Sequence, residues 1–287
     1  MANREKNGAP RPELAYRNLR FLESADARAL RILSEYLDPL AHFKRVGLQR
    51  TAVFFGSARI RSREVAVQNL RALELLVKQG SSGALQAELK RARMDVHMSR
   101  YYEDARELSR LITSWVMKLN KGSRFLTVCS GGGPGIMEAA NRGAAEAGGR
   151  SVGLNIKLPM EQTPNPYISP ELSMLFRYFF MRKLWFAQPA EALIVFPGGF
   201  GTMDEMWEFL TLIQTRKMRR HVTILLYGSK FWKRAVNFGW LLEAGTIGPE
   251  DLKLIRFADS PGQAFEILRS ELEPRFGLRP AIKQPFM

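Results

Sequence analysis

The sequence contains few of the residues that build metal sites and disulfides. Cys129 is the one cysteine among 287 residues, which excludes an intramolecular disulfide framework and a multi-cysteine zinc site. The three histidines, His42, His97 and His221, form no HExxH motif, and there is no CxxC pair for them to join. We therefore expect no metal and no cofactor, and we expect no nucleophilic triad built on histidine.

Long apolar runs are also absent. No uninterrupted apolar stretch approaches the ~18 residues that cross a membrane, and residues 1–6 open no apolar signal-peptide core. We therefore expect no membrane contact and a cytoplasmic location. Apolar residues make up 46% of the chain and charged residues 25%, which excludes global disorder and leaves enough apolar surface for a sizeable core.

Acidic residues are outnumbered, because 28 Asp and Glu oppose 43 Lys and Arg and leave a formal net charge of +15. This excess lies outside the glycine-rich middle of the chain, where residues 123–210 contain 7 basic and 8 acidic side chains. The densest basic cluster, residues 216–220, has no interleaved aromatic residues of the kind that stack on single-stranded nucleic acid. We interpret it as a solvated helix end or an oligomer contact and expect no nucleic-acid partner.

Short apolar runs alternate with longer stretches of helical character. The runs predict buried strands at Thr51–Phe55, Phe125–Cys129, Val152–Ile156, Ala192–Phe196, Val222–Leu226 and Leu254–Phe257. The stretches between them predict helices at Tyr101–Leu119, Ile136–Ala147, Ser173–Ala187, Met203–Thr215 and Phe231–Glu243. This alternation is typical of βαβ units. The sequence therefore predicts an α/β fold, a Rossmann-like doubly wound parallel sheet.

Two regions extend this core. Leucines between Pro12 and Phe43 recur at three- and four-residue steps, which predicts an N-terminal helical arm over residues 1–45. Residues 56–124 separate the first two strands, although a crossover needs only about a dozen residues. We therefore predict a helical insertion at about 62–98 within a core domain of residues 46–275, followed by a C-terminal tail of residues 276–287.

Two glycine-rich loops carry the strongest local signal, and each follows a predicted strand and opens a helix. Their glycines are Gly131, Gly132 and Gly133 in the first loop and Gly198, Gly199 and Gly201 in the second. Glycine lets the backbone approach a ligand closely, and a helix N-terminus offers unpaired N–H groups to an anion. Because parallel strands end at one edge of a sheet, both loops would share that edge with Gly56 and Ser57, which follow the first strand. Neither loop reads GxGxxG or GxxxxGK[ST], so the dinucleotide fingerprint and the P-loop are both excluded.

Polar side chains beside the second loop indicate which groups of a ligand the site could contact. Thr202 can donate a hydroxyl to a phosphate, and Glu205 lies close enough in sequence to reach a ribose attached to that phosphate. Asp204 either serves the helix dipole or has a functional role. Arg182 and Lys183 sit on an otherwise apolar helix, where a cation pair either extends to water or points into a polar pocket.

Together these motifs resemble the LOG (Lonely Guy) family of cytokinin riboside 5′-monophosphate phosphoribohydrolases, long mislabelled as lysine decarboxylases. The resemblance is carried by the PGGFGTMDE segment 197–205, the Arg182-Lys183 pair and the GGGPGIMEA segment 131–139, and it extends to residues 56–59 and 158–167. The sequence of the first loop is more similar to the longer bacterial nucleotide nucleosidases of the family.

The resemblance implies a Rossmann-like fold, a homodimer or higher homo-oligomer, and hydrolysis of a nucleoside 5′-monophosphate, such as AMP or a cytokinin ribotide, to free base and ribose 5-phosphate. By motif position it implies that Arg182 and Glu205 are catalytic. Lys183 and the loop residues Gly56, Ser57, Gly131–Gly133 and Gly198–Thr202 would bind the substrate. Two other interpretations remain open. One is a non-catalytic nucleotide-binding or regulatory protein. The other is a pyridoxal-dependent decarboxylase using Lys183 or Lys157, for which the sequence offers no pocket beyond the phosphate loops.

Overall fold

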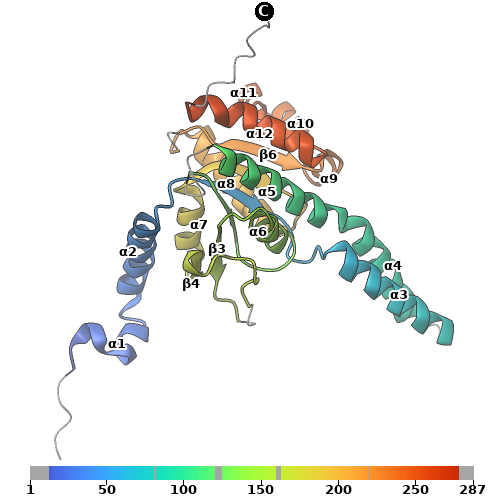
Figure 1. Cartoon of the computed structure of the whole chain (residues 1–287), viewed down its shortest axis with the longest axis horizontal. Helices are drawn as coiled ribbons and strands as arrows, with labels where there is room; N and C mark the ends of the chain where they lie inside the picture. Colours follow the sequence, from blue (N-terminus) through green and yellow to red (C-terminus); the bar gives the residue numbers. More distant parts are fainter. Residues whose placement is uncertain (1–12, 81, 120–124, 160–162, 219, 278–287) are drawn as a thin grey trace, which may run out of the picture.

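The computed structural model describes residues 13–80, 82–119, 125–159, 163–218 and 220–277 (Figure 1). Its strands are β1 Thr51–Phe55, β2 Thr127–Ser130, β3 Ser151–Ile156, β4 Ser173–Phe176, β5 Ala190–Val195, β6 Thr223–Tyr227 and β7 Ile255–Ala258. They form one seven-stranded sheet in the order β4-β3-β2-β1-β5-β6-β7, with every neighbouring pair parallel. The chain builds one half outward from β1 and then returns to build the other half from β5. This order confirms the predicted doubly wound α/β fold.

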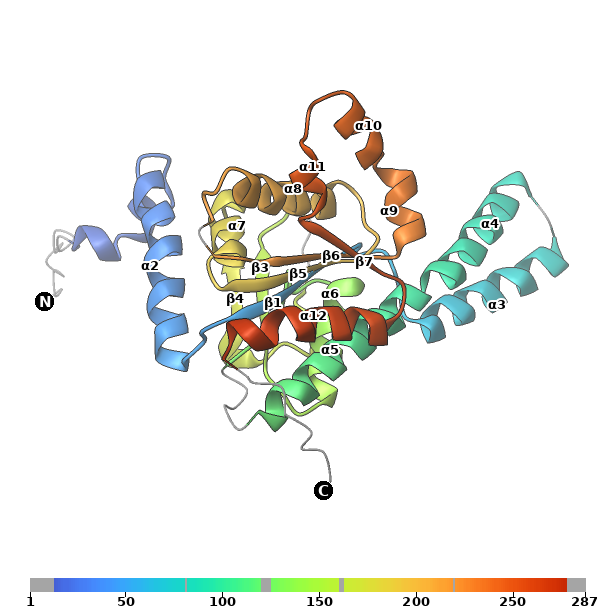
Figure 2. The ribbon, with the colours of Figure 1, turned by 90° about the horizontal axis from the view of Figure 1, so that it is seen from above.

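Helices cover both faces of the sheet, because the central strands present apolar side chains on both faces. Ala52 and Phe54 of β1 face one core, and Val53 and Phe55 face the other. The first core is covered by α5 (Arg100–Lys118), α6 (Ile136–Glu146) and α12 (Pro261–Arg275). The second is covered by α7 (Phe179–Ala187), α8 (Phe200–Gln214) and α9 (Ser229–Ala235). Figure 2 shows α5 and α12 on one side of the strands and α7 and α8 on the other.

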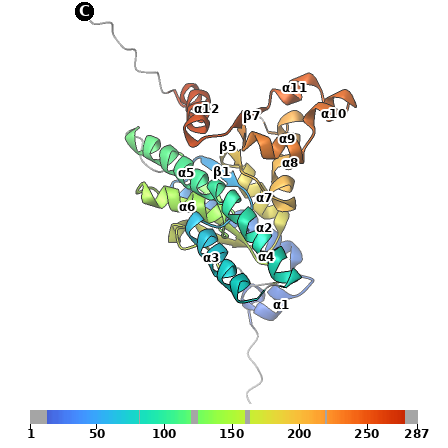
Figure 3. The ribbon, with the colours of Figure 1, turned by 90° about the vertical axis from the view of Figure 1, so that its right-hand side faces the viewer.

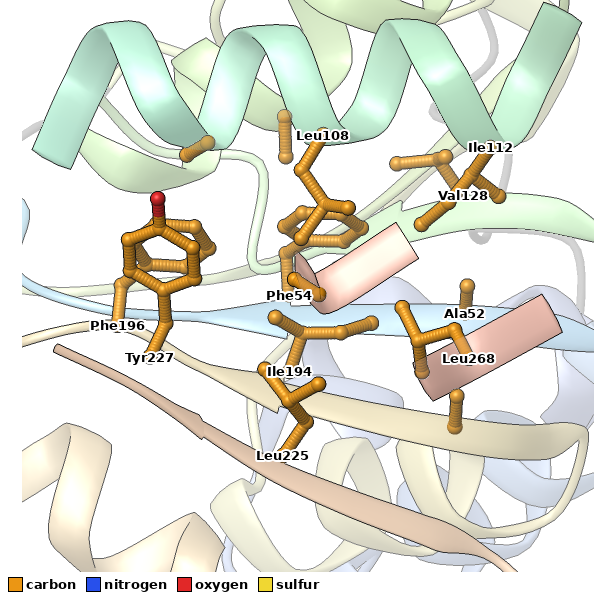
Figure 4. Packing of buried hydrophobic residues seen from close by; sticks show 14 of the residues in the cluster. Ala52, Phe54, Leu108, Ile112, Val128, Ile194, Phe196, Leu225, Tyr227 and Leu268 are labelled. Carbon is orange, nitrogen blue, oxygen red and sulfur yellow. The ribbon is translucent and has the colours of Figure 1, made fainter. Parts of the chain in front are cut away.

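Aromatic packing ties together the central strands whose loops build the site. The ring of Phe196 lies between those of Phe54 and Tyr227, with centroid distances of 6.2 and 4.3 Å (Figure 4). Leu108 and Ile112 of α5 close over the same core. This dense packing holds β1, β5 and β6 in fixed register, so the loops beyond their carboxyl ends have fixed starting points.

The predicted helix at Ser173–Ala187 is partly wrong. Residues Ser173–Phe176 instead form β4, the edge strand, which pairs with β3, and α7 begins only at Phe179. A short apolar run such as SMLF does not reveal by its periodicity whether it is a strand or a helix. The segment forms a strand because β3 has a free edge beside it, and pairing there gives hydrogen-bond partners to the backbone N–H and C=O groups of both strands.

The predicted helix at Phe231–Glu243 is divided in two. The chain leaves α9 at Ala235 and starts α10 (Phe238–Glu243) at Asn237, whose side chain accepts a hydrogen bond from the backbone N–H of Trp240 at 2.9 Å. Asparagine favours such N-cap positions, which explains the break. The short α11 (Pro249–Leu252) and then α12 follow, and neither helix was predicted.

Two helical regions extend beyond the sheet and its covering helices. The arm consists of η1 (Ala15–Arg17), α1 (Leu19–Glu23) and α2 (Arg28–Val46), and α2 packs against α7. Between β1 and α5, α3 (Arg63–Gln79) and α4 (Gly83–Met98) form a hairpin that projects on the opposite side from the arm (Figure 2). Figure 3 shows α3 and α4 side by side.

The division of the chain into arm, core domain and tail stays a prediction. Of the tail at 276–287, residues beyond Gly277 lie outside the described part of the chain, as do residues 1–12 of the arm. Across the described residues, every helix is too short or too polar to cross a lipid bilayer.

Candidate functional site

A pocket of about 630 Å³ opens beyond the carboxyl ends of β1, β2 and β5. These strands are neighbours in the sheet, with β1 in the middle, so their loops meet at one edge. Of the residues predicted for the site, the following line this pocket: Gly56, Ser57, Gly131, Arg182, Gly199, Gly201, Thr202 and Glu205. The structure thus brings the three predicted loops and both members of the predicted charged pair together.

The loop after β1 connects the two glycine-rich loops. The backbone N–H of Ser57 donates to the carbonyl of Pro197 at 3.0 Å, and the carbonyl of Ser57 accepts from the N–H of Ile136 at 3.2 Å. Each glycine loop is therefore hydrogen-bonded to the same residue. A ligand held by one loop has a fixed position relative to the other.

Buried asparagine side chains fix the first glycine loop by hydrogen bonds on its protein-facing side. The side-chain amide of Asn165 lies 3.1 Å from the carbonyl oxygens of both Gly132 and Gly133 and 2.9 Å from Oδ1 of Asn141. Ser130 donates its hydroxyl to the same Oδ1 at 2.6 Å and accepts from the N–H of Gly132 at 3.1 Å. Because these carbonyls are turned back into the protein, the loop keeps one conformation. Asn141 and Ser130 were not predicted, and only the position of Asn165 within the resemblance pointed to it.

Replacing Asn165 by alanine tests this support. The change leaves the buried carbonyl of Gly133 without this donor, whereas that of Gly132 still accepts the backbone N–H of Asn165 at 2.9 Å. We expect it to lower the free energy of unfolding by about 1–3 kcal/mol. Urea denaturation measures the effect. Asn237→Ala is the matched control, since that exposed side chain accepts a single hydrogen bond and its loss should cost about 1 kcal/mol. Equal losses in the two variants would contradict the supporting role of Asn165.

The second glycine loop leads directly into α8. Gly199 is the N-cap, and a side chain at Gly198 would overlap Thr202, whose Cβ would lie 2.5 Å from the added atom. The loop therefore folds tightly over the first turn of α8, with Thr202 buried beneath it. This arrangement leaves the N-terminal backbone of α8 at the pocket, where a helix N-terminus favours an anion.

A buried ion pair forms one wall of the pocket. Nη2 of Arg182 on α7 lies 3.3 Å from Oε1 of Glu205 on α8, and their side chains are 13% and 4% exposed. The guanidinium also lies between the rings of Phe179 and Phe186, at 5.1 and 5.5 Å from their centroids. Among the described residues, Oε2 of Glu205 and Nε of Arg182 are buried and have no hydrogen-bond partner. Each group therefore has unused hydrogen-bonding capacity in the wall of the pocket.

Burial changes the acidity of both groups. It raises the pKa of Glu205 to about 7, because loss of solvent penalises the carboxylate more than the nearby charges of Arg182 and Lys183 favour it. Burial also lowers the pKa of Arg182, against the opposing effect of Glu205. A carboxyl group with a pKa near neutrality and one unused oxygen can exchange a proton with a bound molecule.

Some of the predicted residues lie outside the pocket lining. The ammonium of Lys183 points to the outer side of α8, 2.8 Å from Asp204 and 3.1 Å from Glu208, so its placement does not support a role in binding the phosphate. Gly132, Gly133 and Gly198 do not line the cavity, and a side chain at Gly132 or Gly198 would overlap Asn155 or Thr202. Helix geometry explains why Lys183 lies outside the pocket although Arg182 lines it, because neighbouring positions on α7 face different directions.

An apolar wall completes the pocket and was not predicted. Its residues are Phe55, Ala58, Met137, Ile156, Leu158, Phe179, Phe200 and Met203. Phe179 precedes Arg182 by three residues on α7, a spacing that places both on one face and could have identified it. Phe200 lies at the mouth and is 94% exposed. The pocket therefore pairs a polar, loop-lined side with an apolar side suited to a flat ring.

Comparison with known proteins shows similarity over part of the chain. Residues 137–268 match the family model described as "Possible lysine decarboxylase". A stretch of 118 residues is 30% identical to the pyrimidine/purine nucleotide 5′-monophosphate nucleosidase of Escherichia coli K12, and the same values hold for that of Escherichia coli O157:H7. The match covers 38% of this chain and 26% of the relatives, so the chain spans about a quarter of their length.

Two solved structures are more distantly similar. The molybdenum cofactor carrier protein of Chlamydomonas reinhardtii is 18% identical with a TM-score of 0.43, over 78% of this chain and 98% of that one. The molybdenum cofactor binding protein of Rippkaea orientalis is 18% identical with a TM-score of 0.41, over 59% and 88%. With scores this low, the fold assignment depends on the sheet order described above.

Proposed function

We propose that this chain hydrolyses the N-glycosidic bond of nucleoside 5′-monophosphates, a proposal supported by the family match over residues 137–268 and by the similarity to nucleotide 5′-monophosphate nucleosidases. The products would be a free base and ribose 5-phosphate. One observation carries the proposal: the buried Arg182–Glu205 pair, with unused hydrogen-bonding atoms, faces the same pocket as two glycine loops.

The glycine loops would hold the 5′-phosphate. Backbone N–H groups at Gly131 and at the start of α8 are suited to an anion, and Thr202 adds a hydroxyl. Fixing the phosphate there would align the ribose C1′ with Glu205, so that binding energy far from the reacting atom is used for orientation. The apolar wall around Phe179 and Ile156 would receive the base. This wall also suits the prenyl group of a cytokinin ribotide.

Cleavage of an N-glycosidic bond passes through a ribose with oxocarbenium character, as glycoside hydrolysis does. Ionised Glu205 would stabilise that positive charge and accept a proton from the water that attacks C1′. The electrons of the C1′–N bond leave with the base, which takes up a proton from solvent. Arg182 would hold Glu205 in position through the Nη2–Oε1 contact, and its Nε remains available to the substrate.

The test is to incubate the purified chain with AMP, GMP, CMP and an N6-prenylated AMP and to separate the products by chromatography. Equal amounts of free base and ribose 5-phosphate are expected from at least one substrate. Binding of these nucleotides without release of base would instead support a non-catalytic nucleotide-binding protein.

The proposal predicts a specific pH dependence. The active form of Glu205 is the carboxylate, and its pKa is raised to about 7. We therefore expect kcat/KM, which reports the free enzyme, to fall as the pH drops below 7, approaching about tenfold per pH unit, and to level off above it. The free nucleotide, whose second phosphate pKa is about 6, adds its own effect only below about pH 6. A kcat/KM that stays constant between about pH 6 and 7 would contradict Glu205 as the titrating group.

A further inference from the structure

Of the described residues, three with charged side chains line the pocket, and two of them neutralise each other. Nη2 of Arg182 lies 3.3 Å from Oε1 of Glu205 in the buried ion pair. The third is Arg59, an exposed residue in the loop after β1. Its side chain makes no ion pair or hydrogen bond with another described residue. Arg59 therefore brings to the pocket a positive charge that no described neighbour balances.

The substrate of the proposed reaction carries a negative charge that the ion pair does not balance. A 5′-phosphate has a charge of about −1.5 to −2 at pH 7. Arg182 is already neutralised by Glu205, and Lys183 is held by two carboxylates on the outer side of α8. The backbone N–H groups of the glycine loops act as dipoles and carry no net charge. Among the residues lining the pocket, Arg59 is thus the cation that can balance a phosphate.

The loop after β1 places Arg59 beside both glycine loops. Each glycine loop is hydrogen-bonded to the backbone of Ser57, and Arg59 follows two residues later. The intervening residue packs directly on the first loop, because a Cβ added at Gly135 would lie 2.8 Å from Cα of Ala58. The long side chain of Arg59 therefore begins next to the place where the two loops meet.

The backbone around Arg59 is fixed, whereas its guanidinium is not. The backbone N–H of Arg59 donates to Oγ of Ser57 at 3.1 Å. The next residue, Ile60, is 7% exposed and packs in the core beneath α5 and α6. Binding of a ligand by Arg59 would therefore order one side chain and no additional backbone, which keeps the entropy cost low.

The base of the nucleotide is the competing partner for Arg59, since a guanidinium also stacks on flat rings. Charge favours the phosphate, because the common bases are neutral at pH 7 and the phosphate is not. The apolar wall around Phe179 and Ile156 already offers the base a surface. The guanidinium, by contrast, matches a phosphate geometrically, since its N–H groups can donate two parallel hydrogen bonds to phosphate oxygens.

We propose that Arg59 binds the 5′-phosphate and thereby makes the site select nucleoside 5′-monophosphates over nucleosides. The inference rests on the proposed function, because it names the side chain that would recognise the charged end of that substrate. In this arrangement the glycine loops shape the phosphate site and Arg59 supplies its positive charge. The Arg182–Glu205 pair is left to act on the ribose.

The test compares Arg59→Gln with Arg61→Gln in the full chain carrying Glu205→Gln, in which hydrolysis is slowed. Arg61 is the matched control, because it is an exposed arginine of the same loop that does not line the pocket. Calorimetry at pH 8, where the phosphate is a dianion, gives the dissociation constants of AMP and of ribose 5-phosphate. Arg59→Gln should weaken both ligands at least about tenfold, and Arg61→Gln should leave both within about twofold.

Two further variants complete the comparison. Arg59→Lys keeps the charge and should bind both ligands more tightly than Arg59→Gln does. Circular dichroism checks that each protein is folded, and Arg59→Met, which is also uncharged, takes the place of Arg59→Gln if that variant does not fold.

Unchanged affinities in the uncharged Arg59 variant would overturn the proposal. So would a loss for AMP without a loss for ribose 5-phosphate, since Arg59 would then contact the base. An equal loss in Arg61→Gln would reduce the effect to a general field of positive charge and would also overturn it. Base release from AMP by the unmodified chain is measured separately. If no base is released but the expected affinities are found, the proposed hydrolysis fails while Arg59 remains the phosphate ligand.

Discussion

Replacing Glu205 by glutamine is expected to lower kcat for base release by about 10²–10⁴-fold, the range that removal of a positioned acid–base group costs. The amide keeps the size of the side chain and an oxygen for Nη2 of Arg182, which lies 3.3 Å from Oε1. It loses the negative charge that would face the developing oxocarbenium ion. Nucleotide affinity should change little, because the glycine loops that would hold the phosphate are untouched. Steady-state kinetics with the preferred nucleotide, together with its binding constant, measure both effects.

Asp204→Asn is the matched control for this experiment. Asp204 precedes Glu205 on the same helix, but its side chain is 59% exposed, pairs with Lys183 and does not line the pocket. Its replacement removes the same charge with the same isosteric change, and we expect kcat to stay within a fewfold of the unmodified protein. A Glu205→Gln variant with full activity would end the assignment of Glu205. Equal losses in both variants would point to a general effect of charge on α8.

Replacing Gly135 by alanine should destabilise the fold strongly, for two separate reasons. Gly135 is the N-cap of α6 with φ at +71°, a region that costs other residues about 1–3 kcal/mol. An added Cβ would also overlap the Ser57 carbonyl and lie 2.7 Å from the carbonyl carbon of Ala58. Both obstacles are backbone, which cannot rotate away. We expect a loss of at least about 3 kcal/mol in the free energy of unfolding, measured by urea denaturation.

Gly148→Ala separates the two causes. Gly148 also has a positive φ, at +73°, but no atom lies within 4 Å of its added Cβ. This variant should show only the conformational cost, about 1–2 kcal/mol. The difference between the two variants measures how tightly the loop after β1 packs against the start of α6. If both variants lose the same stability, that close contact contributes nothing.

The parts of the fold that the sequence predicted well are those with strong local patterns. Thr51–Phe55 is a strand with the predicted bounds, because five buried apolar or β-favouring residues followed by glycine leave few alternatives. The segment Ser173–Ala187 shows the limit. Its first residues belong to β4 only because the edge of β3 lies beside them, and local periodicity does not register pairing with residues 20 positions earlier in the chain.

The candidate site divides in the same way. The sequence predicted which loops approach each other, since parallel strands end at one edge. The direction of each side chain depended on packing: Arg182 turns toward Glu205 between two phenylalanine rings, whereas the adjacent Lys183 pairs with Asp204 and Glu208. Asn141 and Ser130 gave no local signal, because a buried polar residue is identified only by the partners that tertiary folding brings to it.

For this protein, the sequence by itself determined the alternation of strands and helices and the positions of the glycine loops, because these depend on residue type and spacing along the chain. Only the tertiary structure decided that Glu205 loses its solvent and gains a pKa near 7, and that Phe43 of α2 is buried while Leu33 and Leu37 of the same helix remain exposed. The physical reason is that solvation and burial are properties of surfaces. Surfaces are formed only when distant segments of the chain pack together.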